Sequence, residues 1–139
     1  MGTRSRVGVM HGGVCKSVYC HYDGYLEYTG EILNKYYSSS AANELISRGD
    51  NSGVQKTIEE MNFYADRGED NVGWQVAHTF EEFLEQVEGC GAEYYYVMQN
   101  GEWYVGAVYA VAGLIKGGLV PLADALAQNT IEHLVAEDE

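Results

Sequence analysis

The segment "SVYCHYDGYLEYTG", residues 17–30, gathers side chains that could recognise a ligand next to a tight turn. Four tyrosines lie within it, and aromatic rings can stack on a nucleobase or another flat ligand. Asp23-Gly24 ends the predicted strand, and binding sites are often built where a strand gives way to a turn. We therefore predict that the segment contributes five residues to a ligand site: Tyr19, His21, Tyr22, Asp23 and Tyr25. Burial in the core is nevertheless the commoner role for any single tyrosine.

Two arginines would add positive charge to this site. Arg4 belongs to "GTRS" at the entry to the first strand, and Arg67 belongs to the glycine-containing loop "DRGED". A guanidinium group can bind an anionic ligand through two parallel hydrogen bonds, or it could pin the 17–30 turn. The alternative for Arg67 is local pairing with its acidic neighbours, which contributes little to stability. The sequence leaves both interpretations open.

The charge distribution bears on the class of ligand. The formal net charge is −13, which argues against direct binding of nucleic acid because phosphate neutralisation requires basic residues. Residues 1–40 hold four basic and three acidic residues, a net +1, whereas residues 41–139 hold four basic and eighteen acidic residues, a net −14. The tyrosine-rich segment therefore lies in the part of the chain that best tolerates an anionic ligand. The acidic remainder could simply be a solubilising surface.

The sequence lacks a catalytic or cofactor signature. His21 and Asp23 could form an orienting pair for acid–base chemistry, but a structural histidine at a turn is the commoner arrangement. No P-loop or dinucleotide-binding glycine motif is present. Cys20, His21 and Asp23 form a weak metal candidate, because adjacent residues of a strand point to opposite faces. We predict no enzyme activity, no cofactor and no metal.

The location is expected to be the cytoplasm. The N-terminus lacks an apolar signal region, and the longest apolar stretch is too short to span a bilayer. The three cysteines form no CxxC pair, so we interpret them as buried apolar residues rather than disulfide partners.

Hydrophobic periodicity and turn residues predict one domain over residues 1–139. The first predicted hairpin pairs residues 5–10 with 14–21, and the second has Asn100-Gly101 as its turn. Helices are predicted over 26–37, over 40–48 with serine caps and Gly49 at the end, after the Thr79 cap, and from Pro121 onward. Residues 50–73 are expected to form a loop with one helical turn near 55–60. The predicted fold class is α+β, an antiparallel sheet built from two β-hairpins with helices packed mainly on one face.

Four motifs resemble a family of small uncharacterised proteins from tailed phages and prophages. They are "GTRS", "VYCHYDGYLEYTGEIL", "FYADRGED" and "EYYYVMQNGEWYV", in this order along the chain. The family's turn motif reads Y-C-H-[WY]-D-G-Y-L-E, and Tyr22 stands where tryptophan is common. The resemblance covers the larger part of the chain and departs in the stretch 106–120. It implies a phage origin and an infected bacterium as the site of action, but it brings no assigned activity.

These observations lead to three hypotheses. The first is a phage anti-defence protein that binds and sequesters a nucleotide-derived signalling molecule without cleaving it. The second is an acidic nucleic-acid mimic that inhibits a basic host defence or DNA-binding protein. The third, a small hydrolase using His21 and Asp23, has the least support. A sequestering protein should present a concave, aromatic, locally basic pocket, whereas a mimic should space carboxylates along one exposed face. Homo-oligomerisation is left open.

Overall fold

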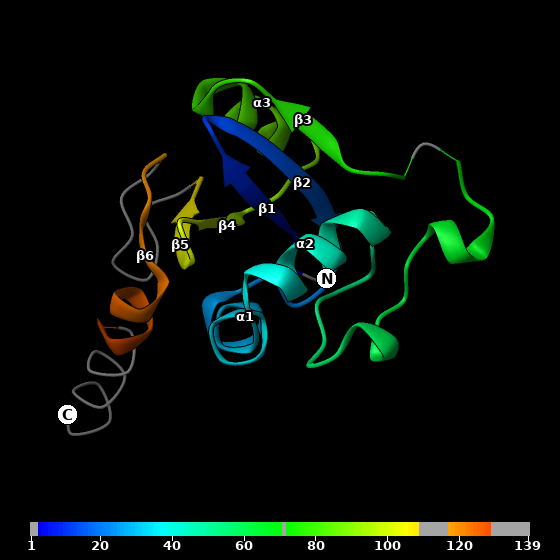
Figure 1. The fold of residues 1–139 in the computed structure, drawn as a ribbon, viewed down its shortest axis with the longest axis horizontal. Coiled ribbons are helices and arrows are strands. Elements are labelled where there is room, and N and C mark those ends of the chain that lie inside the picture. Colours follow the sequence, from blue (N-terminus) through cyan, green and yellow to red (C-terminus); the bar gives the residue numbers. More distant parts are fainter. Residues whose placement is uncertain (1–2, 71, 109–116, 129–139) are drawn as a thin grey trace.

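The computed structural model describes residues 3–70, 72–108 and 117–128. One six-stranded sheet runs through them in the order β3-β2-β1-β4-β5-β6 (Figure 1). The strands are β1 (Ser5–His11), β2 (Val14–Cys20), β3 (Gln75–Ala77), β4 (Tyr94–Gln99), β5 (Glu102–Ala107) and β6 (Val120–Pro121). The class is thus α+β, as the sequence predicted.

Two pairs of neighbouring strands are joined by tight turns whose residues favour left-handed backbone. β1 and β2 pair antiparallel across Gly12 and Gly13, which both have positive φ. β4 and β5 pair antiparallel across Asn100 and Gly101, with φ of 53° and 77°. Two positive φ angles in succession suit a type I′ turn, whose twist matches that of the flanking strands. Both antiparallel pairs lie where the sequence predicted hairpins.

The prediction of a purely antiparallel sheet is wrong at its centre. β1 and β4 pair in parallel, from Ser5 opposite Tyr94 to Met10 opposite Gln99. Between β2 and β4 the chain forms α1, α2, β3 and α3. This long connection brings the start of β4 beside the start of β1, as a parallel pair requires. Turn residues report the pairing of strands that follow each other directly. They carry no information about this distant pair, nor about β3, which pairs antiparallel with β2 and was not predicted.

The helices begin and end where local capping residues place them. A π-helical turn, Leu26–Gly30, runs into α1 (Glu31–Tyr36) and matches the helix predicted over 26–37. α2 (Ser39–Arg48) begins after Ser38, whose hydroxyl accepts a hydrogen bond from the Ala41 N–H, and it ends at Gly49 with a φ of 94°. α3 (Phe80–Gly89) is capped by Thr79 as predicted, because the Thr79 hydroxyl accepts from the Glu82 N–H at 3.1 Å.

Short helical pieces complete the connections. Ile58–Glu60 and Ala65–Arg67 are single 3₁₀ turns in the long loop between α2 and β3. Residues 122–128 are helical, as expected after Pro121, while the rest of that predicted helix lies outside the described residues. None of the helices within the described ranges is long and apolar enough to cross a membrane.

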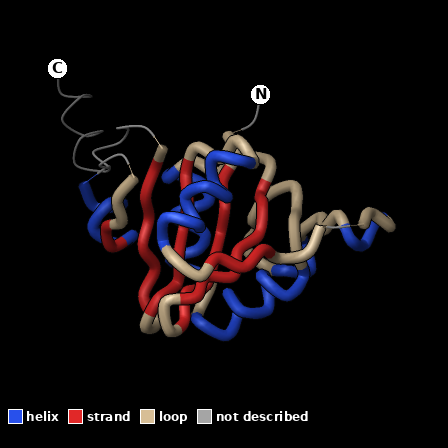
Figure 2. Tube along the Cα trace, turned by 90° about the horizontal axis from the view of Figure 1, so that it is seen from above, coloured by secondary structure: helices blue, strands red, loops and turns tan. Residues whose placement is uncertain are grey.

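Helices cover both faces of the sheet, which corrects the expectation of one mainly covered face. Figures 1 and 2 show α1 and α2 on one side of the strands and α3 on the other. The two cores follow the alternation of β4, because Tyr96 and Met98 pack on the α1–α2 side while Tyr95 and Val97 pack on the α3 side. The consecutive tyrosines of β4 therefore serve two cores rather than a surface.

Candidate functional site

Three of the predicted site residues touch one another at the end of β2. The Tyr19 hydroxyl lies 2.5 Å from His21 Nδ1, and the rings of His21 and Tyr22 meet edge to face with centroids 4.4 Å apart. The Tyr22 ring is half exposed. Tyr22 therefore keeps an exposed ring surface beside a histidine, and a stacking role for it stays a prediction.

Asp23 and Tyr25 hold the turn in shape. Asp23 has a φ of 57°, and its carbonyl accepts a hydrogen bond of 2.6 Å from the Thr29 hydroxyl. The Tyr25 ring packs against Tyr28, with centroids 6.2 Å apart. Gly24 donates its N–H to the Thr3 carbonyl, which ties the turn to the start of β1. The contacts of Asp23 and Tyr25 are thus directed at the turn itself.

The two predicted arginines have different surroundings. The Arg67 guanidinium pairs with Glu69 at 2.7 Å and lies over the Tyr64 ring at 4.5 Å, which is the local pairing considered from the sequence. Arg4 lies close enough to Tyr19 for its charge to act on that phenol. Burial raises the pKa of Tyr19, and the positive charge of Arg4 works against this rise. Arg4, Tyr19, His21 and Tyr22 thus gather at one end of the sheet, whereas Arg67 is engaged locally.

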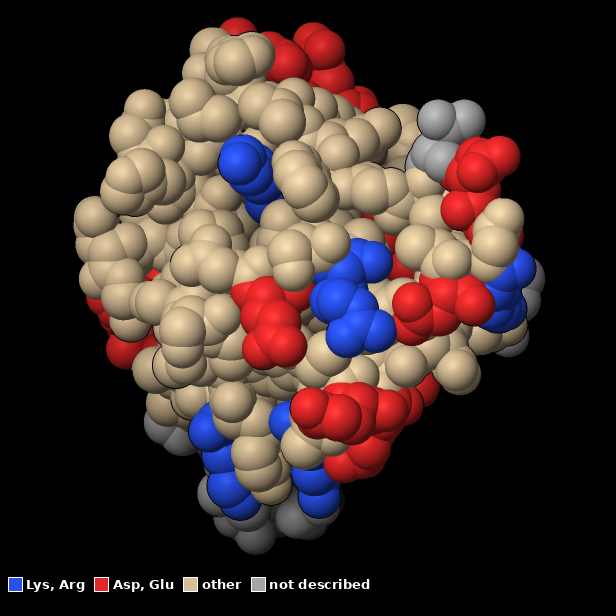
Figure 3. Space-filling model, turned by 45° about the vertical axis from the view of Figure 1, so that its right-hand side comes forward, with Lys and Arg blue, Asp and Glu red and all other residues tan. Residues whose placement is uncertain are grey.

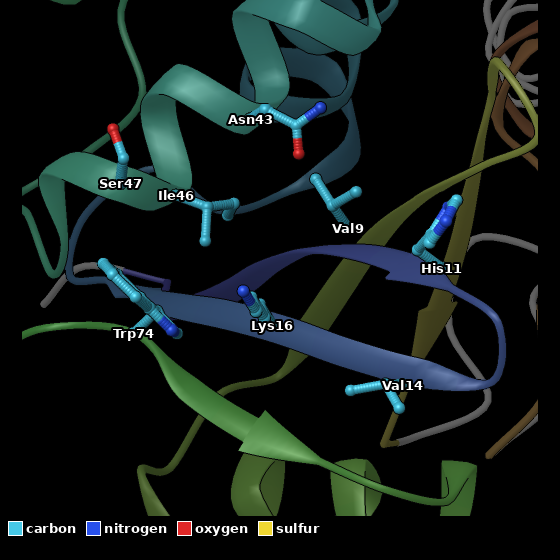
Figure 4. Close-up of a pocket in the computed structure, with 8 residues that line it drawn as sticks. All are labelled: Val9, His11, Val14, Lys16, Asn43, Ile46, Ser47 and Trp74. Carbon is cyan, nitrogen blue, oxygen red and sulfur yellow. The ribbon is translucent and has the colours of Figure 1, made fainter.

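A concave pocket with the predicted chemistry lies elsewhere, on the α2 face of the sheet (Figure 4). Its volume is about 400 Å³. We call it the Trp74 pocket and define it by the residues that line it: Val9, His11, Val14, Lys16, Asn43, Ile46, Ser47 and Trp74.

Strand alternation and helix periodicity bring these side chains together. Val9 and His11 are two residues apart on β1, and Val14 and Lys16 are two apart on β2, so all four point to the same face. α2 crosses this face and contributes Asn43, Ile46 and Ser47, which have the i, i+3, i+4 spacing of one helix side. Trp74 enters from the chain just before β3 (Figure 4).

The Trp74 pocket combines an apolar floor with an exposed ring and a cation. Trp74 is 45% exposed, and Lys16 Nζ lies 5.6 Å from the centre of its ring. No carboxylate lines the pocket, and Lys16 forms no ion pair within the described residues. Four other hollows of the described residues include glutamates in their linings. In a chain of net charge −13 this pocket is therefore suited to an anion that carries a flat ring.

Sequence reasoning missed the lining of this pocket for an identifiable reason. Trp74 reaches it through the pairing of β3 with β2, in which Lys16 stands opposite Val76. That pairing joins residues far apart in the chain, so no local motif reports it. The one available signal was Lys16, a single cation in an otherwise uncharged strand.

Charge is mixed on the side of the molecule that carries the loop between α2 and β3. Figure 3 shows basic and acidic side chains interspersed there. Arg48 pairs with Asp66 at 3.0 Å, and Arg67 pairs with Glu69. α3 differs, since Glu81, Glu85 and Glu88 are exposed on a helix without a lysine or arginine. Within the described residues, no three His, Cys, Asp or Glu side chains are grouped to hold a metal ion.

The chain matches no protein-family model, no curated protein and no solved structure.

Proposed function

We propose that this protein binds and sequesters a nucleotide-derived small molecule in the Trp74 pocket without cleaving it. The observation that carries the proposal is a concave, aromatic, locally basic pocket free of carboxylates in a strongly acidic chain. Such a combination is what distinguishes a sequestering protein from an acidic mimic.

Each part of the pocket has a counterpart in a nucleotide. The base stacks on Trp74, a contact that contributes about 1–3 kcal/mol in proteins that bind bases through aromatic side chains. The phosphate lies near Lys16, whose charge favours an anion, and near His11, whose ring offers an N–H donor. Asn43 donates its amide N–H to the Ser39 carbonyl, and the Ser47 hydroxyl donates to the Glu44 carbonyl at 2.6 Å. The Asn43 amide oxygen and the Ser47 oxygen can therefore accept hydrogen bonds from N–H groups of the ligand. These contacts require no bond to be broken.

The biological setting that we propose is based on the sequence resemblance to small phage proteins. A small phage protein that removes a nucleotide-derived signal from the host cytoplasm would act as an anti-defence factor. Sequestration needs affinity and a sufficient amount of protein rather than turnover.

Inhibition of a basic host protein is the second candidate, and α3 supplies the observation that favours it. Its exposed glutamates lie on one helix with no basic residue to offset them. Binding through such a surface should weaken steeply with salt. A pull-down at low salt tests it, and recovery of no basic or DNA-binding host protein would remove this candidate.

The proposal is tested by titrating the protein with cyclic dinucleotides, cyclic AMP and AMP. The chain has two tryptophans, and Trp103 is buried with its indole N–H bonded to the Tyr37 carbonyl at 2.9 Å. Stacking on Trp74 should therefore change the exposed component of the fluorescence and leave the buried component as an internal reference. Chromatography after incubation should return the nucleotide unchanged.

Calorimetry of variants locates the site. Trp74→Ala and Lys16→Ala should each weaken binding about tenfold to a hundredfold, as expected for losing a contact of about 1–3 kcal/mol. Tyr36→Ala is the matched control, because its ring is 42% exposed with Lys35 Nζ and Lys56 Nζ 5.4 and 5.8 Å away, yet it lies outside the pocket. If Tyr22→Ala and Arg67→Ala abolish binding while Trp74→Ala retains it, the site is the 17–30 turn instead.

A further inference from the structure

A second groove lies on the opposite face of the sheet, between the strands and α3. Its volume is about 610 Å³, and Arg6 and Tyr19 contribute to its lining. We call it the Arg6 groove. Tyr19 and Gln75 point to this face because they share strand alternation with Cys15 and Ala77, which pack under α3.

Arg6 is the unusual residue of this groove. It is 2% exposed, and its Nε donates to the Ser17 hydroxyl at 2.7 Å while Nη2 donates to the Ser17 carbonyl at 3.2 Å. The remaining partner, Cys90 Sγ, is a weak acceptor 3.8 Å from Nη1. No carboxylate pairs with Arg6 within the described residues. The charge of Asp50, which also lines the groove, acts on Arg6, but no carboxylate of the described residues bonds directly to the guanidinium. A buried guanidinium is most stable when an anion hydrogen-bonds to it, so the groove has an unfilled place for a contacting carboxylate.

The opposite charge lines the rest of the groove. Asp50, Glu82 and Glu85 contribute three carboxylates, and neither glutamate has an ion-pair partner within the described ranges. Gln86 holds the Val76 carbonyl through its amide N–H at 2.9 Å, which leaves its buried Oε1 without a partner. This wall offers acceptors to a cationic group that donates several hydrogen bonds.

We propose that the Arg6 groove binds a small zwitterion, an α-amino acid with a cationic side chain, whose carboxylate meets Arg6 and whose cationic side chain meets Glu82 and Glu85. A polyanion is repelled by the three carboxylates, and a purely cationic amine leaves Arg6 without a directly bonded carboxylate. The groove is therefore complementary to arginine or lysine and distinct in charge from the Trp74 pocket. The same chemistry occurs at a basic C-terminal residue of a peptide, which the experiment separates from the free amino acid.

The test is calorimetry at low ionic strength with L-arginine, N-acetyl-L-arginine and agmatine. L-Arginine should bind with one molecule per chain. Agmatine, which lacks the carboxylate, should bind at least about tenfold more weakly than L-arginine. If N-acetyl-L-arginine binds as tightly as L-arginine, the ligand of the groove is the basic C-terminal residue of a peptide. If N-acetyl-L-arginine binds more weakly, the ligand is the free amino acid. Absence of binding by both arginine compounds, or equal binding of agmatine, would overturn the proposal.

Two protein-side measurements complete the test. Glu82→Gln with Glu85→Gln should weaken arginine binding about tenfold or more, whereas Glu81→Gln with Glu88→Gln, the same charge change outside the lining, should not. L-Arginine should also slow alkylation of Cys90, which lines the groove, and agmatine should do so less. Equal loss in both double variants would show that only the field of α3 matters and would overturn the proposed contacts. Because both measurements leave Arg6 intact, neither depends on whether an Arg6 variant folds.

Discussion

At the scale of single residues, the three cysteines differ in their ability to react. Burial raises the pKa of Cys15 and of Cys20 to about 12, so both remain neutral thiols near neutral pH. Cys90 is half-buried and lies beside the Arg6 guanidinium. We predict that iodoacetamide at about pH 8 modifies one cysteine per folded chain, because the thiolate is the reacting form and Cys90 is the accessible thiol. Peptide mass mapping identifies the modified residue.

Cys90→Ser provides the control, since the folded variant should take up no label and the urea-unfolded variant should take up two. Rapid labelling of Cys20 in the folded wild type would contradict the burial on which this prediction depends.

At the scale of elements, the pairing of β4 with β5 depends on a close approach between the two strands. Gly106 stands opposite Tyr95, and a Cβ at this position would overlap the Tyr95 ring and the Gly118 carbonyl. Tyr95 is fully buried, and its hydroxyl donates to that same carbonyl at 2.7 Å. We predict that Gly106→Ala lowers the free energy of unfolding by about 1–3 kcal/mol, the usual cost of overpacking a core. Urea unfolding followed by circular dichroism measures it.

Gly101→Val separates this packing effect from a backbone effect. A Cβ at Gly101 meets nothing within 4 Å, but its φ of 77° disfavours a branched residue. The variant should lose about 1–2 kcal/mol through the turn alone. Wild-type stability of Gly106→Ala would show that β5 and Gly118 do not approach as described.

At the scale of the whole molecule, both faces of the sheet bury neutral phenol groups in their cores. Burial raises the pKa of Tyr37 and Tyr95 from an ordinary value of 10.0 to about 12, and it also raises the pKa of Tyr96 well above that ordinary value. Above about pH 9 the unfolded chain therefore releases protons that the folded chain retains. We predict that stability is unaffected by these groups below about pH 9 and falls as the pH rises toward 12. Thermal melts over this range measure the fall.

Tyr37→Phe removes one such phenol, so its melting temperature should fall less steeply with rising pH than that of the wild type. The hydroxyl also donates to the Gln55 carbonyl at 2.7 Å, so the variant should start from a lower stability. A melting temperature independent of pH between about 9 and 12 would contradict the burial of these groups.

The sequence by itself determined the features that depend on neighbours in the chain. Asn100-Gly101 specifies its turn because both residues tolerate positive φ, and Thr79 and Ser38 specify helix starts because their hydroxyls accept nearby N–H groups. Tertiary structure alone decided the parallel pairing of β1 with β4, the covering of both faces and the short strand β3 that carries Trp74 to Lys16. These pairings join distant segments and are selected by burial of the whole sheet, for which no short motif is a signal. The cluster at Tyr19 could be anticipated in part because its members follow one strand, whereas the Trp74 pocket and the Arg6 groove exist only once separate elements meet.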